Sequence, residues 1–129
     1  MNASDPKTVD PALAAFLDDY IGLYTRDKLP RWRELFLPEF VASSTNDDGS
    51  VTTWRLDAFF DRQRSSFATG KPISEVLENV ATERVGRLVQ VRSGFVWTDG
   101  DVRRRGKLML QLIEQHGALR IQALTFSYA

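Results

Sequence analysis

Residues 85–128, VGRLVQVRSGFVWTDGDVRRRGKLMLQLIEQHGALRIQALTFSY, decide the fold of this 129-residue chain. Valine and aromatic residues dominate residues 87–97, a composition typical of strands, and this run ends at Asp99-Gly100. Asp-Gly is a strong hairpin signal, because glycine adopts the positive φ that a type I′ turn requires without a Cβ clash. A second turn is expected at residues 115–118, so the stretch predicts three antiparallel strands.

The middle strand of the three, residues 102–113, begins polar and becomes apolar at nearly every position from Leu108 to Ile113. Successive side chains of a strand point to opposite faces, so this pattern predicts that neither face meets water there. The last strand, residues 119–128, is also apolar on both faces. We therefore expect an interior strand, with the chain's own helices on one face of the sheet and a second layer or subunit on the other.

Helices dominate the first half of the chain. Asp10-Pro11 is an N-cap followed by proline at the first helical position, and apolar residues then recur at three- and four-residue steps up to Tyr24. A short helix is expected over residues 31–37, where Pro38 would end it, and another over residues 56–67.

The remaining segments predict shorter strands, a leader and a single domain. Strand patterns occupy residues 40–45, 51–54 and 73–85, and the first two are joined by a turn. The order is therefore helix, helix, hairpin, helix, and then four strands. Residues 1–9 show no periodicity and are expected to be a disordered leader before one domain at residues 10–129.

Composition narrows the function classes. Lys plus Arg and Asp plus Glu number 17 each, so the overall field that attracts nucleic acid or an anionic membrane is absent. Cysteine is absent too, which excludes a disulfide scaffold, a thiolate metal site and a cysteine nucleophile. No apolar run reaches the roughly 18 residues that a membrane span needs. We expect a cytoplasmic protein with no cofactor and no nucleic-acid or membrane partner.

A metal centre is not expected. His116 is the only histidine, and its place beside Gly117 predicts an exposed loop tip. Zinc and non-haem iron sites gather several His, Cys or carboxylate ligands, which a lone histidine in a turn does not supply.

The element order and the motif RWRELFLPEF at residues 31–40, which leads into a strand, resemble the nuclear transport factor 2-like superfamily. This superfamily includes SnoaL-like polyketide cyclases and ketosteroid isomerases, and the resemblance covers residues 11–128. It implies an α+β fold, a cystatin-like roll in which a cone-shaped, strongly curved mixed sheet wraps around three N-terminal helices. It also implies a pocket against the inner sheet face and a homodimer formed through the outer sheet face.

The ketosteroid isomerase branch combines a carboxylate base with two hydrogen-bond donors to an enolate oxygen. The resemblance places Tyr20 at a donor position, Ser44 near the base and Leu110 near the second donor. A serine cannot take up a proton near pH 7 as a carboxylate does, so this chemistry is not expected. Tyr20 and Ser44 are instead the catalytic pair expected for another SnoaL-like reaction, although the default reading of Tyr20 is a buried core tyrosine whose hydroxyl finds a partner.

An apolar ligand pocket needs aromatic walls and a few polar groups, although the same aromatic residues also build cores. The residues expected to contact a ligand are Tyr20, Tyr24, Trp32, Phe36, Ser44, Trp54, Phe59, Phe60 and Arg105.

A basic run, residues 103–107, offers two readings. Alternation places Arg103, Arg105 and Lys107 on one sheet face and Arg104 on the other. An inward arginine could hold a ligand carboxylate through a bidentate contact. The alternative is a solvated strand end whose charges pair with Glu83 or Asp101.

Three functions stay open at this point. The first is binding of an apolar small molecule, and the second is a SnoaL-like isomerase, cyclase or dehydratase acting on an apolar carbonyl compound. The third is a dimerisation or docking module whose pocket is filled by its own side chains. Fold alone does not choose among them, because one fold hosts many activities.

Overall fold

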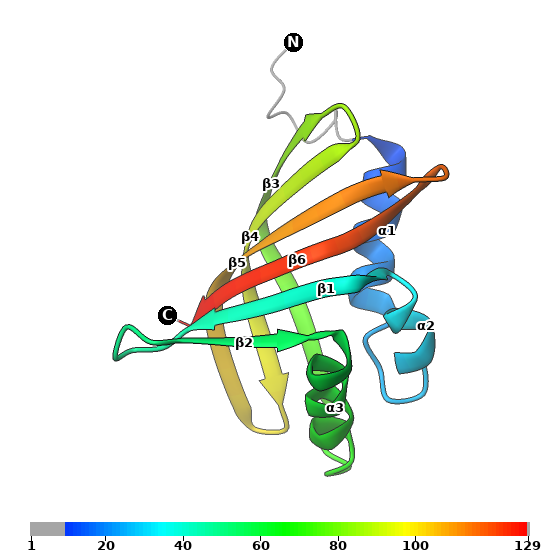
Figure 1. The fold of residues 1–129 in the computed structure, drawn as a ribbon. Coiled ribbons are helices and arrows are strands. Elements are labelled where there is room, and N and C mark those ends of the chain that lie inside the picture. Colours follow the sequence, from blue (N-terminus) through cyan, green and yellow to red (C-terminus); the bar gives the residue numbers. More distant parts are fainter. Residues whose placement is uncertain (1–9, 129) are drawn as a thin grey trace.

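The computed structural model describes residues 10–128, which form three helices and one six-stranded sheet (Figure 1). The leader predicted for residues 1–9 lies outside the described residues. In chain order the elements are α1 (Pro11–Gly22), α2 (Leu29–Arg33), β1 (Phe36–Thr45), β2 (Val51–Arg55), α3 (Leu56–Phe67), β3 (Ile73–Val85), β4 (Leu88–Asp99), β5 (Val102–Gln115) and β6 (Ala118–Tyr128).

The sheet has the strand order β2-β1-β6-β5-β4-β3. Neighbouring strands are antiparallel except β1 and β6, which run parallel, so the sheet is mixed as expected. Figure 1 shows that the sheet curves strongly and that all three helices lie on its concave side. The predicted α+β fold with a curved sheet wrapped around three helices is therefore confirmed.

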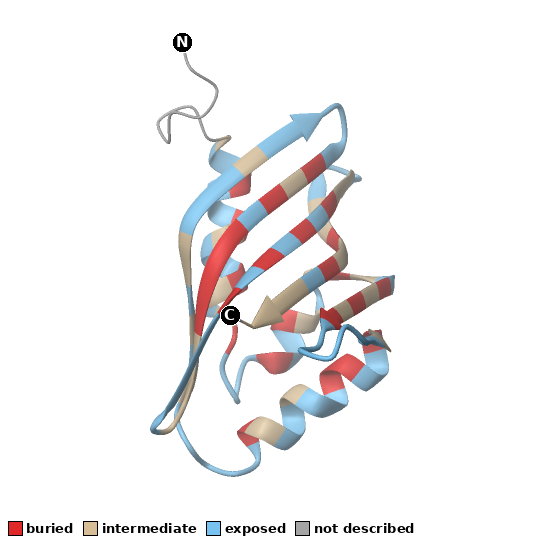
Figure 2. Cartoon of the chain, turned by 90° about the vertical axis from the view of Figure 1, so that its left-hand side faces the viewer, coloured by how far each residue is buried: buried red, intermediate tan, exposed pale blue. Residues whose placement is uncertain are grey.

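β5 is an interior strand between β4 and β6, as predicted. Its side chains alternate, with Leu108, Leu110 and Leu112 buried against the helices and Met109 40% exposed on the other face (Figure 2). The prediction that neither face meets water is therefore wrong for the single chain. The strands present their large buried apolar residues on the concave face, and the helices pack against that face. Among the described residues no helix covers the outer face, so Met109 stays partly exposed.

α1 begins where the sequence predicts. The Asp10 carboxylate accepts a 2.9 Å hydrogen bond from the Ala12 backbone N–H, and Leu13, Phe16 and Tyr20 form the buried stripe. An N-cap of this kind satisfies one of the N–H groups that the first helical turn leaves without a partner.

The second helix is shorter than expected. It ends at Arg33, and Phe36 begins β1, so Pro38 lies inside a strand and does not end a helix. The chain is extended here because β6 supplies backbone hydrogen-bond partners. For example, the Ile121 N–H donates to the Leu35 carbonyl at 2.8 Å. The pairing of β1 with β6 shifts register between Phe36 and Val41, an irregularity that accommodates a residue without an N–H.

Aromatic side chains close one end of the space between helices and sheet. Trp32 contacts Phe36 with ring centroids 4.8 Å apart, and Phe36 contacts Phe40 at the same distance. Phe59 and Phe60 of α3 pack against this group. This cluster joins α2, β1 and α3, and it fixes the helices at the positions from which they border the site.

The β5–β6 turn explains the position of the only histidine. His116 and Gly117 have φ values of 54° and 79°, the two positive values of a type I′ turn, and His116 is exposed as predicted. In the β4–β5 loop only Gly100 has a positive φ, which is the pattern of a type II′ turn and differs from the type I′ turn expected there.

Candidate functional site

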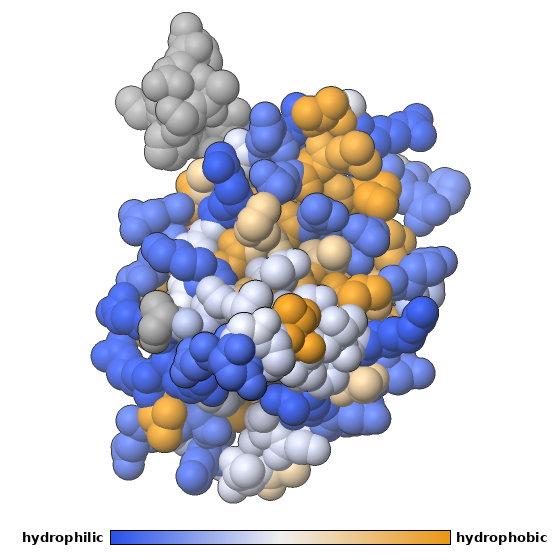
Figure 3. Space-filling view, turned by 60° about the vertical axis from the view of Figure 1, so that its left-hand side comes forward, coloured by the Kyte–Doolittle hydropathy of each residue, from blue (hydrophilic) through white to orange (hydrophobic). Residues whose placement is uncertain are grey.

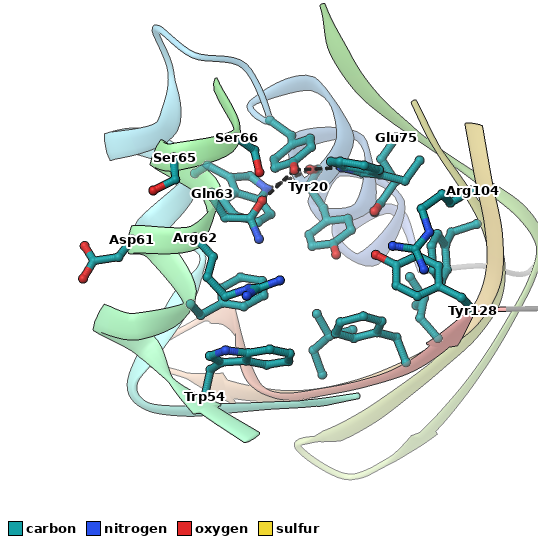
Figure 4. Close-up of a pocket in the computed structure, with 18 residues that line it drawn as sticks. Tyr20, Trp54, Asp61, Arg62, Gln63, Ser65, Ser66, Glu75, Arg104 and Tyr128 are labelled. Atoms are coloured by element: carbon teal, nitrogen blue, oxygen red, sulfur yellow. Dashed lines mark hydrogen bonds between the residues drawn. The ribbon is translucent and has the colours of Figure 1, made fainter. Parts of the chain in front are cut away.

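A cavity of about 510 Å³ opens between α1, α3 and the concave face of the sheet. This volume is within the range of sites that bind small organic molecules. Its walls are mainly aromatic, and a smaller set of polar side chains joins them (Figure 4). The aromatic residues are Tyr20, Tyr24, Trp32, Trp54, Phe59, Phe95, Trp97, Phe126 and Tyr128, and the polar ones include Arg62, Gln63, Glu75 and Arg104.

Strand alternation builds the sheet side of the cavity. Leu124, Phe126 and Tyr128 occupy every second position of β6, and Phe126 lies opposite Leu108 of β5. Gly106 is required at the next inward position of β5, because a Cβ there would lie 2.7 Å from the Phe95 ring and 2.2 Å from the Ser127 carbonyl oxygen. The missing side chain therefore leaves room for Phe95 to form part of the cavity wall.

Glu75 of β3 places a carboxyl group in this aromatic surrounding. Burial raises the pKa of Glu75 from 4.5 to about 7, since the charged form loses hydration. The Tyr20 hydroxyl interacts with the carboxylate and lowers the pKa, but this effect is smaller than that of burial. Glu75 can therefore exchange a proton near neutral pH, which an ordinary glutamate does not.

Tyr20, which belongs to α1, lies opposite Glu75 and is almost fully buried. Burial raises the pKa of its hydroxyl well above 10, and the charge of Glu75 raises the pKa further. Tyr20 is therefore a permanent hydrogen-bond donor at physiological pH. Its position is fixed by Trp32, whose indole N–H donates to the Tyr20 backbone carbonyl.

A second set of hydrogen bonds connects three elements across the cavity wall. The Trp97 indole N–H donates to the Tyr24 hydroxyl at 3.1 Å, and this hydroxyl donates to the Gln63 side-chain carbonyl at 2.6 Å. Burial raises the pKa of Tyr24 as well. β4, α3 and the segment that follows α1 are thereby held together, and Figure 4 marks both bonds.

Two arginines, one in β5 and one in α3, reach the cavity from opposite sides. Arg104 of β5 lies over the Tyr128 ring, with Cζ 3.5 Å from the ring centroid, and Arg62 of α3 lies over Trp54 at 4.7 Å. Burial raises the pKa of Tyr128, Arg104 and Arg62 lower it, and Glu75 raises it. The Tyr128 hydroxyl therefore lies in the electrostatic field of all three charged groups.

Comparison with known proteins gives the fold a name. No protein-family model and no curated protein matches the chain. Among solved structures, the β subunit of benzoate 1,2-dioxygenase from Burkholderia mallei matches with a TM-score of 0.74 and 17% identity, over 100% of this chain and 93% of that one. An NTF-2-like protein of unknown function from Silicibacter pomeroyi matches over the whole of both chains, with a TM-score of 0.71 and 17% identity.

A protein of unknown function with a cystatin-like fold from Nostoc punctiforme also matches, with a TM-score of 0.72 and 6% identity over 92% of this chain and 89% of that one. The chain has the nuclear transport factor 2-like fold. The fold that the resemblance implied from element order and residues 31–40 is thereby confirmed. Identities this low carry the fold and no activity.

Five of the residues expected to contact a ligand lie on the cavity wall: Tyr20, Tyr24, Trp32, Trp54 and Phe59. Phe36 and Phe60 do not, because they are buried in the aromatic cluster that joins α2, β1 and α3. Ser44 is buried as well and lies off the cavity wall, where its hydroxyl contacts only the Thr45 carbonyl, at 3.5 Å. The structure therefore does not bring Tyr20 and Ser44 together as a pair at the cavity.

Alternation separated Arg104 from its neighbours by face but left open which face is inward, and Arg105, which was expected to contact a ligand, lies off the cavity wall. Arg105 lies on the outer face of the NTF2-like sheet, where it forms an ion pair with Glu78 at 2.9 Å, and Arg104 is the inward arginine. The expectation of one inward arginine at the cavity is met, but by a different residue. A strand-end arginine does pair with a carboxylate, but the partner is Glu78 and not Glu83 or Asp101 as predicted.

Glu75 is the residue that the sequence analysis missed. Its strand was expected to have an exposed face because it is rich in Glu and Asn. A signal was available, since Glu75 shares a face with Ile73 and Leu77, which both pack against the core. Within residues 10–128 no cluster of His, Cys, Asp or Glu could hold a metal ion, and no helix is long and apolar enough to cross a membrane.

Proposed function

We propose that this NTF2-like chain binds a small organic molecule with a flat apolar body inside the cavity. The observation that carries the proposal is an open space of about 510 Å³ walled by aromatic side chains. An open cavity supports ligand binding over the docking module, whose pocket its own side chains would fill.

The aromatic wall is arranged before any ligand arrives. Trp54 and Phe126 stack with ring planes 10° apart and centroids 6.3 Å apart, and Phe126 meets Tyr128 edge to face at 5.7 Å. Rings held in this way lose little freedom when a ligand binds. Burying about 200 Å² of apolar ligand surface would contribute about 5 kcal/mol, which association costs largely offset, so polar contacts must add affinity.

A filled cavity tests the proposal. Leu108→Trp places an indole in the cavity, whereas Met109→Trp places it on the outer face of the same strand and is the matched control. The neutral fluorescent probe N-phenyl-1-naphthylamine should bind the wild type and the control, and bind Leu108→Trp at least about tenfold more weakly. Circular dichroism would verify that both variants fold. Equal binding by all three proteins would contradict the proposal.

A second candidate function is general acid–base catalysis, which the buried carboxyl of Glu75 beside Tyr20 supports. The Glu75 carboxylate would remove a proton from a carbon next to a substrate carbonyl, and the electron pair would move to the carbonyl oxygen. The protonated Glu75 would then return the proton to another carbon, an isomerisation, or protonate a leaving hydroxyl, a dehydration. In this proposal Glu75, and not Ser44, is the polar partner of Tyr20.

We also propose that two copies pair through the outer face of the sheet. On that face, Met109 of the interior strand β5 is 40% exposed and Val76 of the edge strand β3 is 55% exposed. Figure 3 shows apolar side chains gathered in the upper part of an otherwise mainly polar surface. Such a face is a frequent location of protein–protein contacts.

A further inference from the structure

Arg62 and Arg104 share an unusual position. Both are exposed and both also line the cavity, so they lie at its rim. They come from different elements, α3 and β5, and Figure 4 shows them reaching toward the cavity from opposite sides. A ligand that enters the cavity passes both guanidinium groups.

Neither guanidinium group has a carboxylate partner within residues 10–128. The ion pairs there use Arg33, Arg64, Arg84 and Arg105. Asp61, which is next to Arg62 and lines the cavity, pairs with Arg64. The rim therefore carries positive charge that the chain itself does not neutralise.

Both guanidinium groups are held in place by aromatic rings. Arg104 rests on Tyr128 and Arg62 on Trp54, and Phe126 packs against both of these rings. A guanidinium stacked on a ring keeps its N–H groups free in its own plane, where they can bind a carboxylate with two parallel hydrogen bonds. The stacking also removes part of the entropy cost of ordering a long side chain.

We propose that Arg62 and Arg104 form an anion-binding rim, and that the ligand is a flat, mainly apolar carboxylate whose acid group they hold while its body enters the aromatic cavity. This inference rests on the proposed binding function and adds the chemical class of the ligand. A carboxylate fits better than a neutral molecule of the same shape, because a neutral ligand leaves two unpaired cations at the rim.

Two carboxylates line the cavity: Asp61, which pairs with Arg64, and Glu75, whose burial makes it the one that a ligand inside the cavity would affect. The groups that face Glu75 are the hydroxyls of Tyr20, Tyr24 and Tyr128, and Arg104 across the cavity. An anionic ligand disfavours the ionised form of Glu75, so binding is accompanied by proton uptake. Affinity for the carboxylate therefore increases as pH falls from 8 to 6, a range in which a ligand carboxylate with a pKa of about 4 stays ionised.

A matched pair of probes tests the inference. We expect the wild type to bind 2-naphthoate about tenfold more tightly than the neutral 2-naphthamide in titration calorimetry at pH 6. Arg62→Gln and Arg104→Gln should each reduce this preference, and the double variant should abolish it while its affinity for 2-naphthamide stays within about twofold. Arg105→Gln, on the outer face of β5, is the control and should change neither affinity.

The outcomes separate this inference from the proposed function. If N-phenyl-1-naphthylamine binds but the wild type does not prefer 2-naphthoate, or if the double variant keeps the preference, the anion-binding rim is wrong and the cavity remains a binding site. If none of the three probes binds, both proposals fail. Glu75→Gln provides a further check, since it should remove the increase in 2-naphthoate affinity between pH 8 and pH 6.

Discussion

The indole N–H of Trp32 donates a 2.8 Å hydrogen bond to the backbone carbonyl of Tyr20, which joins α2 to α1 next to the cavity. We predict that Trp32→Phe lowers the free energy of unfolding by about 1–3 kcal/mol, because it leaves a buried carbonyl without a donor and opens space in the aromatic cluster. Urea denaturation measures this. Trp54→Phe is the comparison and should cost less, since Trp54 is less buried. If both variants lose the same free energy of unfolding, the Trp32 hydrogen bond contributes no particular stability.

Glu75 should make stability depend on pH. Its pKa is about 7 in the folded chain against an ordinary 4.5, so the folded state binds more protons between these values and stability falls as pH rises from 5 to 8. The contribution is at most about 3 kcal/mol. Glu75→Gln should therefore be more stable than the wild type at pH 8 and similar at pH 5, as urea denaturation at both pH values would measure. Glu83→Gln, on the exposed part of β3, controls for loss of a carboxylate. If the free energies of unfolding of the wild type and Glu75→Gln change in parallel with pH, burial does not raise the pKa of Glu75.

The acid–base proposal can be tested without the natural substrate. A desolvated carboxylate accelerates the ring opening of 5-nitrobenzisoxazole, in which the base takes the C3 proton, the N–O bond breaks and a phenolate forms. We expect wild-type turnover, followed by the absorbance of the phenolate, to rise with pH with a midpoint near 7. Glu75→Gln should lose at least about tenfold in rate, and Ser44→Ala should retain it. A rate that is insensitive to Glu75 would exclude this residue as the base.

Gly106 should tolerate no side chain. A Cβ would lie 2.2 Å from the Ser127 carbonyl oxygen, which the backbone of β6 holds in place. We predict that Gly106→Ala destabilises the fold by about 2–3 kcal/mol or more through overpacking, and that it weakens probe binding by displacing Phe95. Thermal unfolding and probe titration measure the two effects. Gly22→Ala, where an added Cβ meets nothing within 4 Å, should leave both unchanged.

Pairing through the sheet predicts a dimer in light scattering at about 10 µM, a concentration at which moderate interfaces are occupied. Met109→Glu should shift the protein to monomer, because it places a charge on the apolar outer face. Val51→Glu, in the β1–β2 hairpin and 61% exposed, should not. A wild-type monomer would disprove the pairing.

Local signals made much of the fold predictable. The N-cap at Asp10 and the turn at His116-Gly117 lie within a few residues of the elements that they define, so the sequence around them was sufficient. The error at the second helix has a long-range cause. Phe36 has helical spacing from Trp32, but its strand partner is Ile121, which is distant in the sequence.

The site was harder to predict than the fold because strand register decides it. The sequence analysis separated Arg104 from Arg105 by face, and only the pairing of β5 with its neighbours determines which of them faces inward. Glu75 depends on contacts with Tyr20, which is far away in the chain. Alternation places Glu75 on the same face as Ile73 and Leu77, but it gives no sign that Tyr20 lies opposite the carboxylate.

The parallel pairing of β1 with β6 has a consequence for biosynthesis. β1 leaves the ribosome early, but its partner β6, which also carries Phe126 and Tyr128, is translated last among the described elements. Until then the first hairpin exposes an unsatisfied edge, which is a site for chaperone capture or intermolecular strand exchange. The cavity between the helices and the sheet is therefore complete only after translation has reached Tyr128, which is part of its wall.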